Sequence, residues 1–236
     1  MTNIPKIIYQ TWKTKKLHKD IKRVRDNIQL LNQDYTMVLY DDADMEQFIK
    51  DNFDDAVYRS YMRLNVGASK ADFWRYCILY INGGVYLDID SDIIRPLNQL
   101  IIGDEQCIIT REKNAGIFNQ WIMVFQKNHP ILLKAIHMCC DNISKNITDI
   151  MELTGPKVFS RAINQVMMPY YDKVVADLYS EQDTLLNNKL NAISNPVRCR
   201  FYGFDMEPFA RWKNPYSNVL YTNCLHWKNE KIIFRD

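Results

Sequence analysis

The residues best suited to chemistry stand together in one segment, Asn82–Pro96, which reads NGGVYLDIDSDIIRP. A strand predicted over Val85–Ile89 runs into Asp88, Asp90 and Asp92, and side chains two positions apart share one face of an extended chain. Carboxylates gathered at the end of a buried strand are costly unless a positive charge binds them. Hard oxygen ligands without a neighbouring cysteine suit Mg²⁺ or Mn²⁺, ions often shared with a diphosphate. The segment therefore predicts a metal site for an anionic ligand; the alternative is a polar turn whose aspartates cap a helix or face water.

A second pair of charged residues lies just upstream, on a helix predicted over Gly67–Asn82 and ended by Gly83 and Gly84. Asp72 and Arg75 are three positions apart and so share one helical face. Because this helix leads directly into the acidic strand, the pair could offer a carboxylate to ribose hydroxyls and a guanidinium to phosphate or sugar oxygens. The alternative is an ordinary ion pair on the protein surface.

The elements that position these residues alternate between strand and helix. Short runs of β-forming residues predict strands, and apolar residues at three- and four-residue steps predict helices. The alternation is typical of an α/β sheet built from parallel crossovers. The other predicted strands are Lys6–Gln10, Tyr35–Tyr40, Cys107–Thr110 and Trp121–Phe125, and the other predicted helices are Leu17–Asn32, one with Met45, Phe48 and Ile49 facing inward, Pro130–Cys140 and Pro156–Met168.

Composition narrows the classes of function. The 236 residues are 47% hydrophobic and 25% charged, as in soluble globular proteins, and predict a single domain over residues 1–236. A net charge of +2 argues against a nucleic-acid partner. No apolar run approaches the ~18 residues of a membrane-spanning helix. No export signal is recognised and the six cysteines form no C-x-x-C pair, so we expect reduced thiols and a cytoplasmic location.

The segment ASKADFWRYCILYINGGVYLDIDSDIIRPL resembles the core of glycosyltransferase family 32, whose pattern is Ser-Asp-x-x-Arg followed by Gly-Gly-x-Tyr-x-Asp-x-Asp. The opening IPKIIYQTWK and the segment YTMVLYDD are similar to the first two strands of that family. Thr154-Gly155-Pro156 resembles a weaker landmark. The chain supplies Asp72, Arg75, Gly83, Gly84, Tyr86, Asp88 and Asp90 in register, with Ala71 in place of the usual serine.

This resemblance implies a GT-A fold, a Rossmann-like α/β/α sandwich with a mixed sheet. It also implies a retaining transfer of a sugar from a UDP- or GDP-linked donor to a hydroxyl of a glycan, lipid or protein, with peripheral membrane contact allowed. Mn²⁺ or Mg²⁺ would be the cofactor. Asp88 and Asp90 are the expected catalytic pair and metal ligands, with His226 as a third ligand or else a packed terminal histidine. The expected donor-binding residues are Gln10, Thr11, Trp12, Asp72, Arg75, Tyr86, Asp88 and Lys228.

Two other functions are compatible with the sequence. A phosphatase of the haloacid-dehalogenase type also uses an Asp-x-Asp pair after an apolar strand, with the first aspartate as nucleophile. A non-catalytic carbohydrate-binding module would keep the fold without the chemistry. Trp212 and Trp227 are candidates to stack on a ligand. For a transferase we expect front-face attack by the acceptor, without a covalent intermediate.

Overall fold

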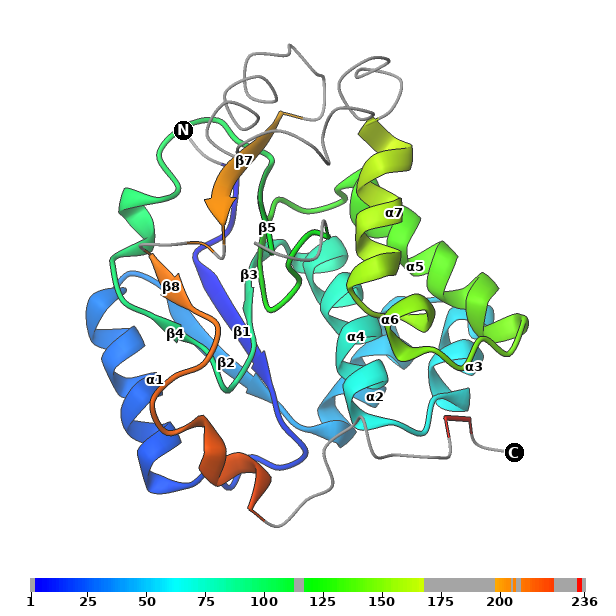
Figure 1. Cartoon of the computed structure of the whole chain (residues 1–236), viewed down its shortest axis with the longest axis horizontal. Helices are drawn as coiled ribbons and strands as arrows, with labels where there is room; N and C mark the ends of the chain where they lie inside the picture. The colour runs from blue at the N-terminus through cyan, green and yellow to red at the C-terminus, as the bar shows by residue number, and fades with distance from the viewer. Residues whose placement is uncertain are drawn as a thin grey trace.

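A six-stranded mixed sheet organises the chain, of which the computed structural model describes residues 3–112, 117–167, 198–204, 206, 209–222 and 233–234 (Figure 1). The strand order is β2-β1-β3-β6-β5-β7. The first three strands are parallel, and β6 runs antiparallel to both of its neighbours. The strands are β1 (Ile7–Thr11), β2 (Thr36–Tyr40), β3 (Gly84–Leu87), β5 (Cys107–Arg111), β6 (Ile122–Phe125) and β7 (Cys199–Phe204), with β4 (Asp92–Ile93) and β8 (Ala210–Arg211) forming a separate pair.

Helices cover both faces of this sheet. In Figure 1 the helix α1 lies on one side and α4, α5 and α7 lie on the other. All helices expected from the sequence are present, and α3 and α6 are additional. The bounds are α1 (Lys19–Leu31), α2 (Asp42–Asn52), α3 (Asp55–Arg63), α4 (Gly67–Asn82), α5 (Pro130–Ser144), α6 (Ile150–Leu153) and α7 (Pro156–Met167), with single-turn 3₁₀ segments η1 (Leu97–Gln99) and η3 (Ser217–Tyr221).

Alternation along the strands builds two apolar layers. Successive side chains of a strand point to opposite faces of the sheet. Ile8 and Val85 accordingly pack in one cluster with Ile28 of α1, whereas Tyr9 and Tyr86 pack in another with residues of α4, α5 and α7. The result is a three-layer α/β/α sandwich, so the predicted α/β class is confirmed.

Two glycines fix the junction between α4 and β3. Gly83 has φ of +64° and Gly84 has φ of +109°, backbone conformations that side chains disfavour. A Cβ on Gly84 would lie 2.8 Å from the carbonyl oxygen of Ile7, and one on Gly83 would lie 2.8 Å from the backbone nitrogen of Lys127. Both positions therefore need glycine, and the tight junction sets where β3 begins.

The end of β3 corrects one expectation. The strand stops at Leu87, not at Ile89, and Asp88–Asp90 form a turn in which the Ser91 N–H donates to the Asp88 carbonyl at 3.0 Å. Ile89 is apolar because it packs with Ile21 and Leu220, not because it continues the strand. The idea that the aspartates share a face of one extended chain is therefore wrong, and Asp92 belongs to β4.

Among the described residues, no helix combines the length and the apolar character needed to cross a bilayer.

Candidate active site

The two acids of the turn lie at the carboxyl edge of three parallel strands. β1, β2 and β3 run in the same direction, so Thr11, Tyr40 and Leu87 end at one edge of the sheet. Open α/β sheets bind ligands at this edge. Gln10, near the end of β1, is buried and its side-chain amide donates to the Asp88 carbonyl oxygen at 3.4 Å. The strand order thus brings the first and third strands of the chain to one candidate site.

Arg75 of α4 joins the predicted residues into one cluster. Its Nη2 lies 3.1 Å from Asp72 Oδ1 and 3.1 Å from Asp88 Oδ1. Its guanidinium carbon stands 4.4 Å from the centre of the Tyr86 ring, and the Tyr86 hydroxyl donates to Asp88 Oδ1 at 2.8 Å. The side chains of Arg75 and Asp72 are only 6% and 9% exposed. The alternative of a surface ion pair is therefore excluded.

A buried polar network surrounds this cluster and includes residues that sequence reasoning missed. Arg75 Nη1 donates to the Gln120 carbonyl oxygen at 2.8 Å, and the Gln120 side-chain amide donates to Asp72 Oδ1 at 2.6 Å. The Tyr76 hydroxyl contacts Gln120 Oε1 at 2.7 Å and the Thr154 carbonyl oxygen at 2.8 Å. Thr154 belongs to a landmark recognised in the sequence, whereas no local pattern marks Gln120.

Burial dominates the electrostatics of these carboxyl groups. Removal from water raises the pKa of Asp72 to about 7, and the neighbouring Arg75 charge offsets only part of this effect. Burial likewise raises the pKa of Asp88; Arg75 again opposes the shift and Asp90 adds to it. The carboxylates of the turn are thus close enough to repel each other, which favours binding of a further cation.

Asp90 is held by a different part of the chain. Its Oδ2 accepts from the Lys213 ammonium and from the Tyr221 hydroxyl, the latter at 2.7 Å. The Asn214 N–H donates to the Asp90 carbonyl oxygen at 2.7 Å. Trp12 packs edge-on against Tyr221 with ring centres 6.1 Å apart. The loop after β1 therefore reaches Asp90 through Tyr221.

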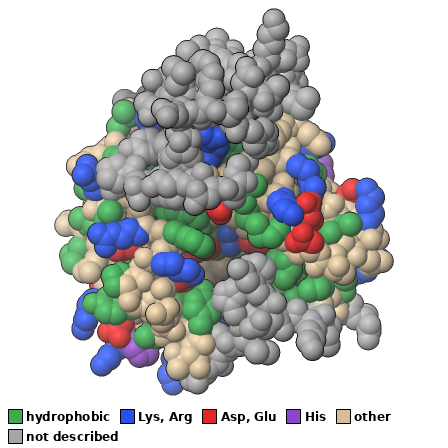
Figure 2. Space-filling model, viewed as in Figure 1, with side chains coloured by type: hydrophobic (Ala, Val, Ile, Leu, Met, Phe, Trp, Pro, Cys, Tyr) green, Lys and Arg blue, Asp and Glu red, His purple; other side chains and the backbone are tan. Residues whose placement is uncertain are grey.

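The donor set of the turn fits a divalent cation of the Mg²⁺ or Mn²⁺ type. Asp88 and Asp90 offer hard carboxylate oxygens, and the chain already places a cation, the Lys213 ammonium, on Asp90 Oδ2. Figure 2 views the face seen in Figure 1 and shows basic and acidic side chains on both sides of a hollow near the centre of the molecule.

Some residues expected at the site do not belong to the cluster around Arg75. The Thr11 hydroxyl is buried and donates to Met45 Sδ at 2.9 Å, so its donor-binding role stays a prediction. Trp212 is 56% exposed, as a stacking residue must be. His226, Trp227 and Lys228 lie outside the described residues, and their roles also stay predictions.

Cys107, His129 and Cys199 bring ligand-type atoms within 4.8 Å of one another, apart from the acidic turn. His129 Nδ1 accepts the Ile131 N–H at 3.3 Å. In the neutral ring the proton then sits on Nε2, so Nε2 presents an N–H and not a lone pair. The tautomer disfavours a metal at these three residues.

The part of the chain that builds this site is similar to a known protein family. Residues 8–107 match a family described as the glycosyltransferase sugar-binding region containing a DXD motif. The predicted family resemblance is confirmed. The matched residues include Asp72, Arg75 and Tyr86, and Asp88-Ile89-Asp90 fits the DXD pattern.

Two curated fission yeast proteins and one solved structure are similar to this chain. An inositol phosphoceramide mannosyltransferase is 36% identical over 56% of this chain and 36% of its own length. An initiation-specific alpha-1,6-mannosyltransferase is 26% identical over 68% of this chain and 48% of its own length. The chain thus spans about a third to a half of these relatives. The PaToxG glycosyltransferase structure covers 80% of this chain and is itself covered to 77%, at a TM-score of 0.60 and 21% identity. That likeness supports the expected GT-A fold.

Proposed function

We propose that this chain transfers a sugar from a nucleoside-diphosphate sugar to an acceptor hydroxyl of a glycan or lipid, with a divalent cation at the DXD turn. The observation that carries the proposal is the paired acidic turn at the carboxyl edge of parallel strands, with Arg75 bound to Asp88. The family description and the names of the relatives point to the same chemistry.

Each residue of the site has a defined task in this proposal. Asp88 and Asp90 would hold the cation, which when bound supplies a positive field for the diphosphate leaving group. Arg75 holds the Asp88 carboxylate in place, and its positive charge opposes the rise in the Asp88 pKa that burial causes. Asp72 accepts from Gln120, which fixes its orientation beside the donor. The loop Gln10–Trp12 lies at the same edge, where a nucleobase would bind.

We further propose that the reaction retains the anomeric configuration by front-face attack of the acceptor. Arg75 and Tyr86 both contact Asp88 Oδ1, so this oxygen is committed to structure and is poorly placed as a nucleophile. The stereochemistry of the product, followed by proton NMR during turnover, tests this part. An inverted product contradicts it, and a trapped glycosyl adduct on any side chain contradicts the absence of a covalent intermediate.

The main test compares UDP- and GDP-linked sugars with the purified chain, with Mn²⁺ or Mg²⁺ and with a chelator. We expect one nucleotide class to raise the melting temperature and to be turned over only with metal, because ligands that bind the native state stabilise it. Asp90→Ala should abolish both effects, whereas Asp55→Ala, at an exposed acid of α3, should abolish neither. Unchanged turnover in Asp90→Ala contradicts the metal assignment.

The same assay separates the two alternatives. A phosphatase of the haloacid-dehalogenase type would release phosphate from a simple phosphomonoester without a nucleotide-sugar. A non-catalytic module would bind sugar and show no metal-dependent turnover. The commitment of Asp88 Oδ1 to Arg75 and Tyr86 argues against its use as the phosphatase nucleophile. Single-domain organisation and a cytoplasmic location stay predictions, to be checked by limited proteolysis and by cell fractionation.

A further inference from the structure

The two acids of the DXD turn are neutralised by cations of different character. Arg75 is buried and is fixed by several contacts, among them the carboxylates of Asp72 and Asp88 and the Gln120 carbonyl oxygen. The Lys213 side chain is 43% exposed, and its ion-pair partner is Asp90. Lysine carries its charge on a flexible stem and is strongly hydrated, so it exchanges partners more readily than a buried arginine.

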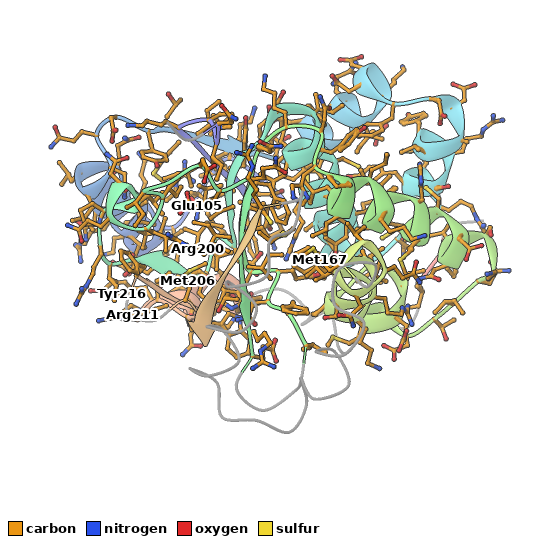
Figure 3. The ribbon with its side chains drawn as sticks, turned by 90° about the horizontal axis from the view of Figure 1, so that it is seen from above. Glu105, Met167, Arg200, Met206, Arg211 and Tyr216 are labelled. Atoms are coloured by element: carbon orange, nitrogen blue, oxygen red, sulfur yellow. The ribbon has the colours of Figure 1, made fainter. Side chains whose placement is uncertain are left out.

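The backbone around Lys213 is anchored while its side chain reaches outward. The Ser91 hydroxyl donates to the Trp212 carbonyl oxygen at 2.5 Å, and the Asn214 N–H donates to the backbone carbonyl oxygen of Asp90. In Figure 3, Arg211 and Tyr216, which flank this stretch, are seen to one side of Met167 at the end of α7. A change of partner by the ammonium therefore requires rotation of one side chain and no movement of the segment.

Two aromatic rings also lie within reach of the ammonium. The Lys213 Nζ stands 5.6 Å from the centre of the exposed Trp212 ring and 5.2 Å from that of Tyr221. Aromatic faces attract a cation at such distances. The charge can thus leave Asp90 Oδ2 without returning fully to bulk water.

We propose that Lys213 is an internal counter-ion of the metal site, which occupies Asp90 until a divalent cation displaces it and which then binds the diphosphate of the donor. This inference rests on the proposed function, because it assumes that Asp90 is a metal ligand. A cation and an ammonium at one carboxylate oxygen repel each other, so the two cannot share Asp90 Oδ2. A displaced ammonium next to a diphosphate gains a charge-assisted hydrogen bond.

The proposal predicts opposite effects of one substitution on two ligands. In Lys213→Met, Mn²⁺ alone should bind at least about threefold more tightly, since its competitor for Asp90 is gone. With Mn²⁺ saturating, UDP or GDP should bind at least about threefold more weakly, since the ammonium is missing. Lys213→Arg keeps the positive charge and should show neither change in full.

The experiment measures Mn²⁺ binding from the spin-resonance signal of the free ion, and nucleotide binding by calorimetry. Lys145→Met is the matched control, because Lys145 pairs with Asp141 on α5 at 2.6 Å and is also half-exposed. Both affinities should be unchanged in the control. Equal Mn²⁺ affinity in wild type and Lys213→Met, or a loss of affinity for both ligands, overturns the counter-ion proposal.

Asp90→Asn separates this proposal from the proposed function. If Asp90→Asn removes Mn²⁺ binding while Lys213→Met leaves it unchanged, the metal site stands and only the role of Lys213 is wrong. If Mn²⁺ binds equally well to Asp90→Asn, the metal assignment fails, and the counter-ion proposal fails with it.

Discussion

The two halves of the acidic turn differ in how the chain supports them. Asp88 is held by residues of α4 and β3, which are adjacent in sequence and buried. Asp90 is held by Lys213 and Tyr221, which lie more than a hundred positions away, one on an exposed stretch and one on a 3₁₀ turn. One half is a rigid unit, and the other half is assembled from a distant segment.

This difference suggests a division of work at the site. A buried ion pair that is fully hydrogen-bonded specifies geometry, but breaking it is costly. The Lys213 side chain is half-exposed although Asp90 is buried, so its flexible and hydrated ammonium can exchange its partner. In the proposed function, the rigid half would fix the position of the donor, and the distant half would change its contacts when a ligand binds.

The largest effect should come from Arg75→Met in the rigid half. The substitution leaves the buried Asp72 and the partly buried Asp88 without their cation, which should lower the free energy of unfolding by about 3–5 kcal/mol at pH 8. The loss should be smaller at pH 5, where Asp72 takes up a proton. Urea denaturation at the two pH values measures this, with Arg59→Met on the surface of α3 as control. A cost near that of the control would remove the distinction between the two halves.

A comparable but smaller effect is expected from Gly84→Ala, which disturbs the junction that sets β3. The new Cβ would meet the Ile7 carbonyl oxygen, and φ of +109° is strained for alanine, so a loss of about 2–4 kcal/mol should follow. Gly67→Ala is the matched control, because a Cβ there meets nothing within 4 Å and φ is ordinary. Thermal and urea unfolding report both values. Equal stability of the two variants would show that the close approach of β1 and β3 is not required.

The same contrast explains what could be predicted from the sequence. Asp72, Arg75 and Asp88 lie in one helix–glycine–strand unit, so helical spacing and the glycine stop suffice to bring them together. Lys213 was not predicted, because its contact with Asp90 depends on the path of the chain between them and leaves no local pattern. The end of β3 was misplaced because Ile89 is apolar for a tertiary reason, its packing against α1 and η3.

The free energy of unfolding should depend on pH through the Asp72 carboxyl group of the rigid half. The pKa of Asp72 is raised to about 7 in the folded state from its usual value of 3.8. The carboxyl group therefore stays protonated up to a higher pH in the folded chain than in the unfolded chain. The stability from this group is present below pH 4 and is lost as the pH rises through 7. Asp72→Asn cannot titrate, so wild type should lose stability relative to the variant across this window. A constant difference between the two unfolding free energies from pH 4 to pH 8 would contradict the raised pKa.

The smallest effect should come from Tyr221→Phe in the distant half. The variant removes one hydrogen bond to Asp90 Oδ2 and keeps the ring that packs on Trp12, so we expect a loss of about 1 kcal/mol or less. Asp90 still keeps Lys213 as its partner, which limits the cost. Tyr76→Phe is the informative counterpart, because that hydroxyl is fully buried between Gln120 and Thr154 and should cost more when removed. Tyr221→Phe could instead be the more destabilising of the two by urea denaturation. The distant half would then be as rigid as the half around Arg75, and the proposed exchange of partners at Asp90 would lose its physical basis.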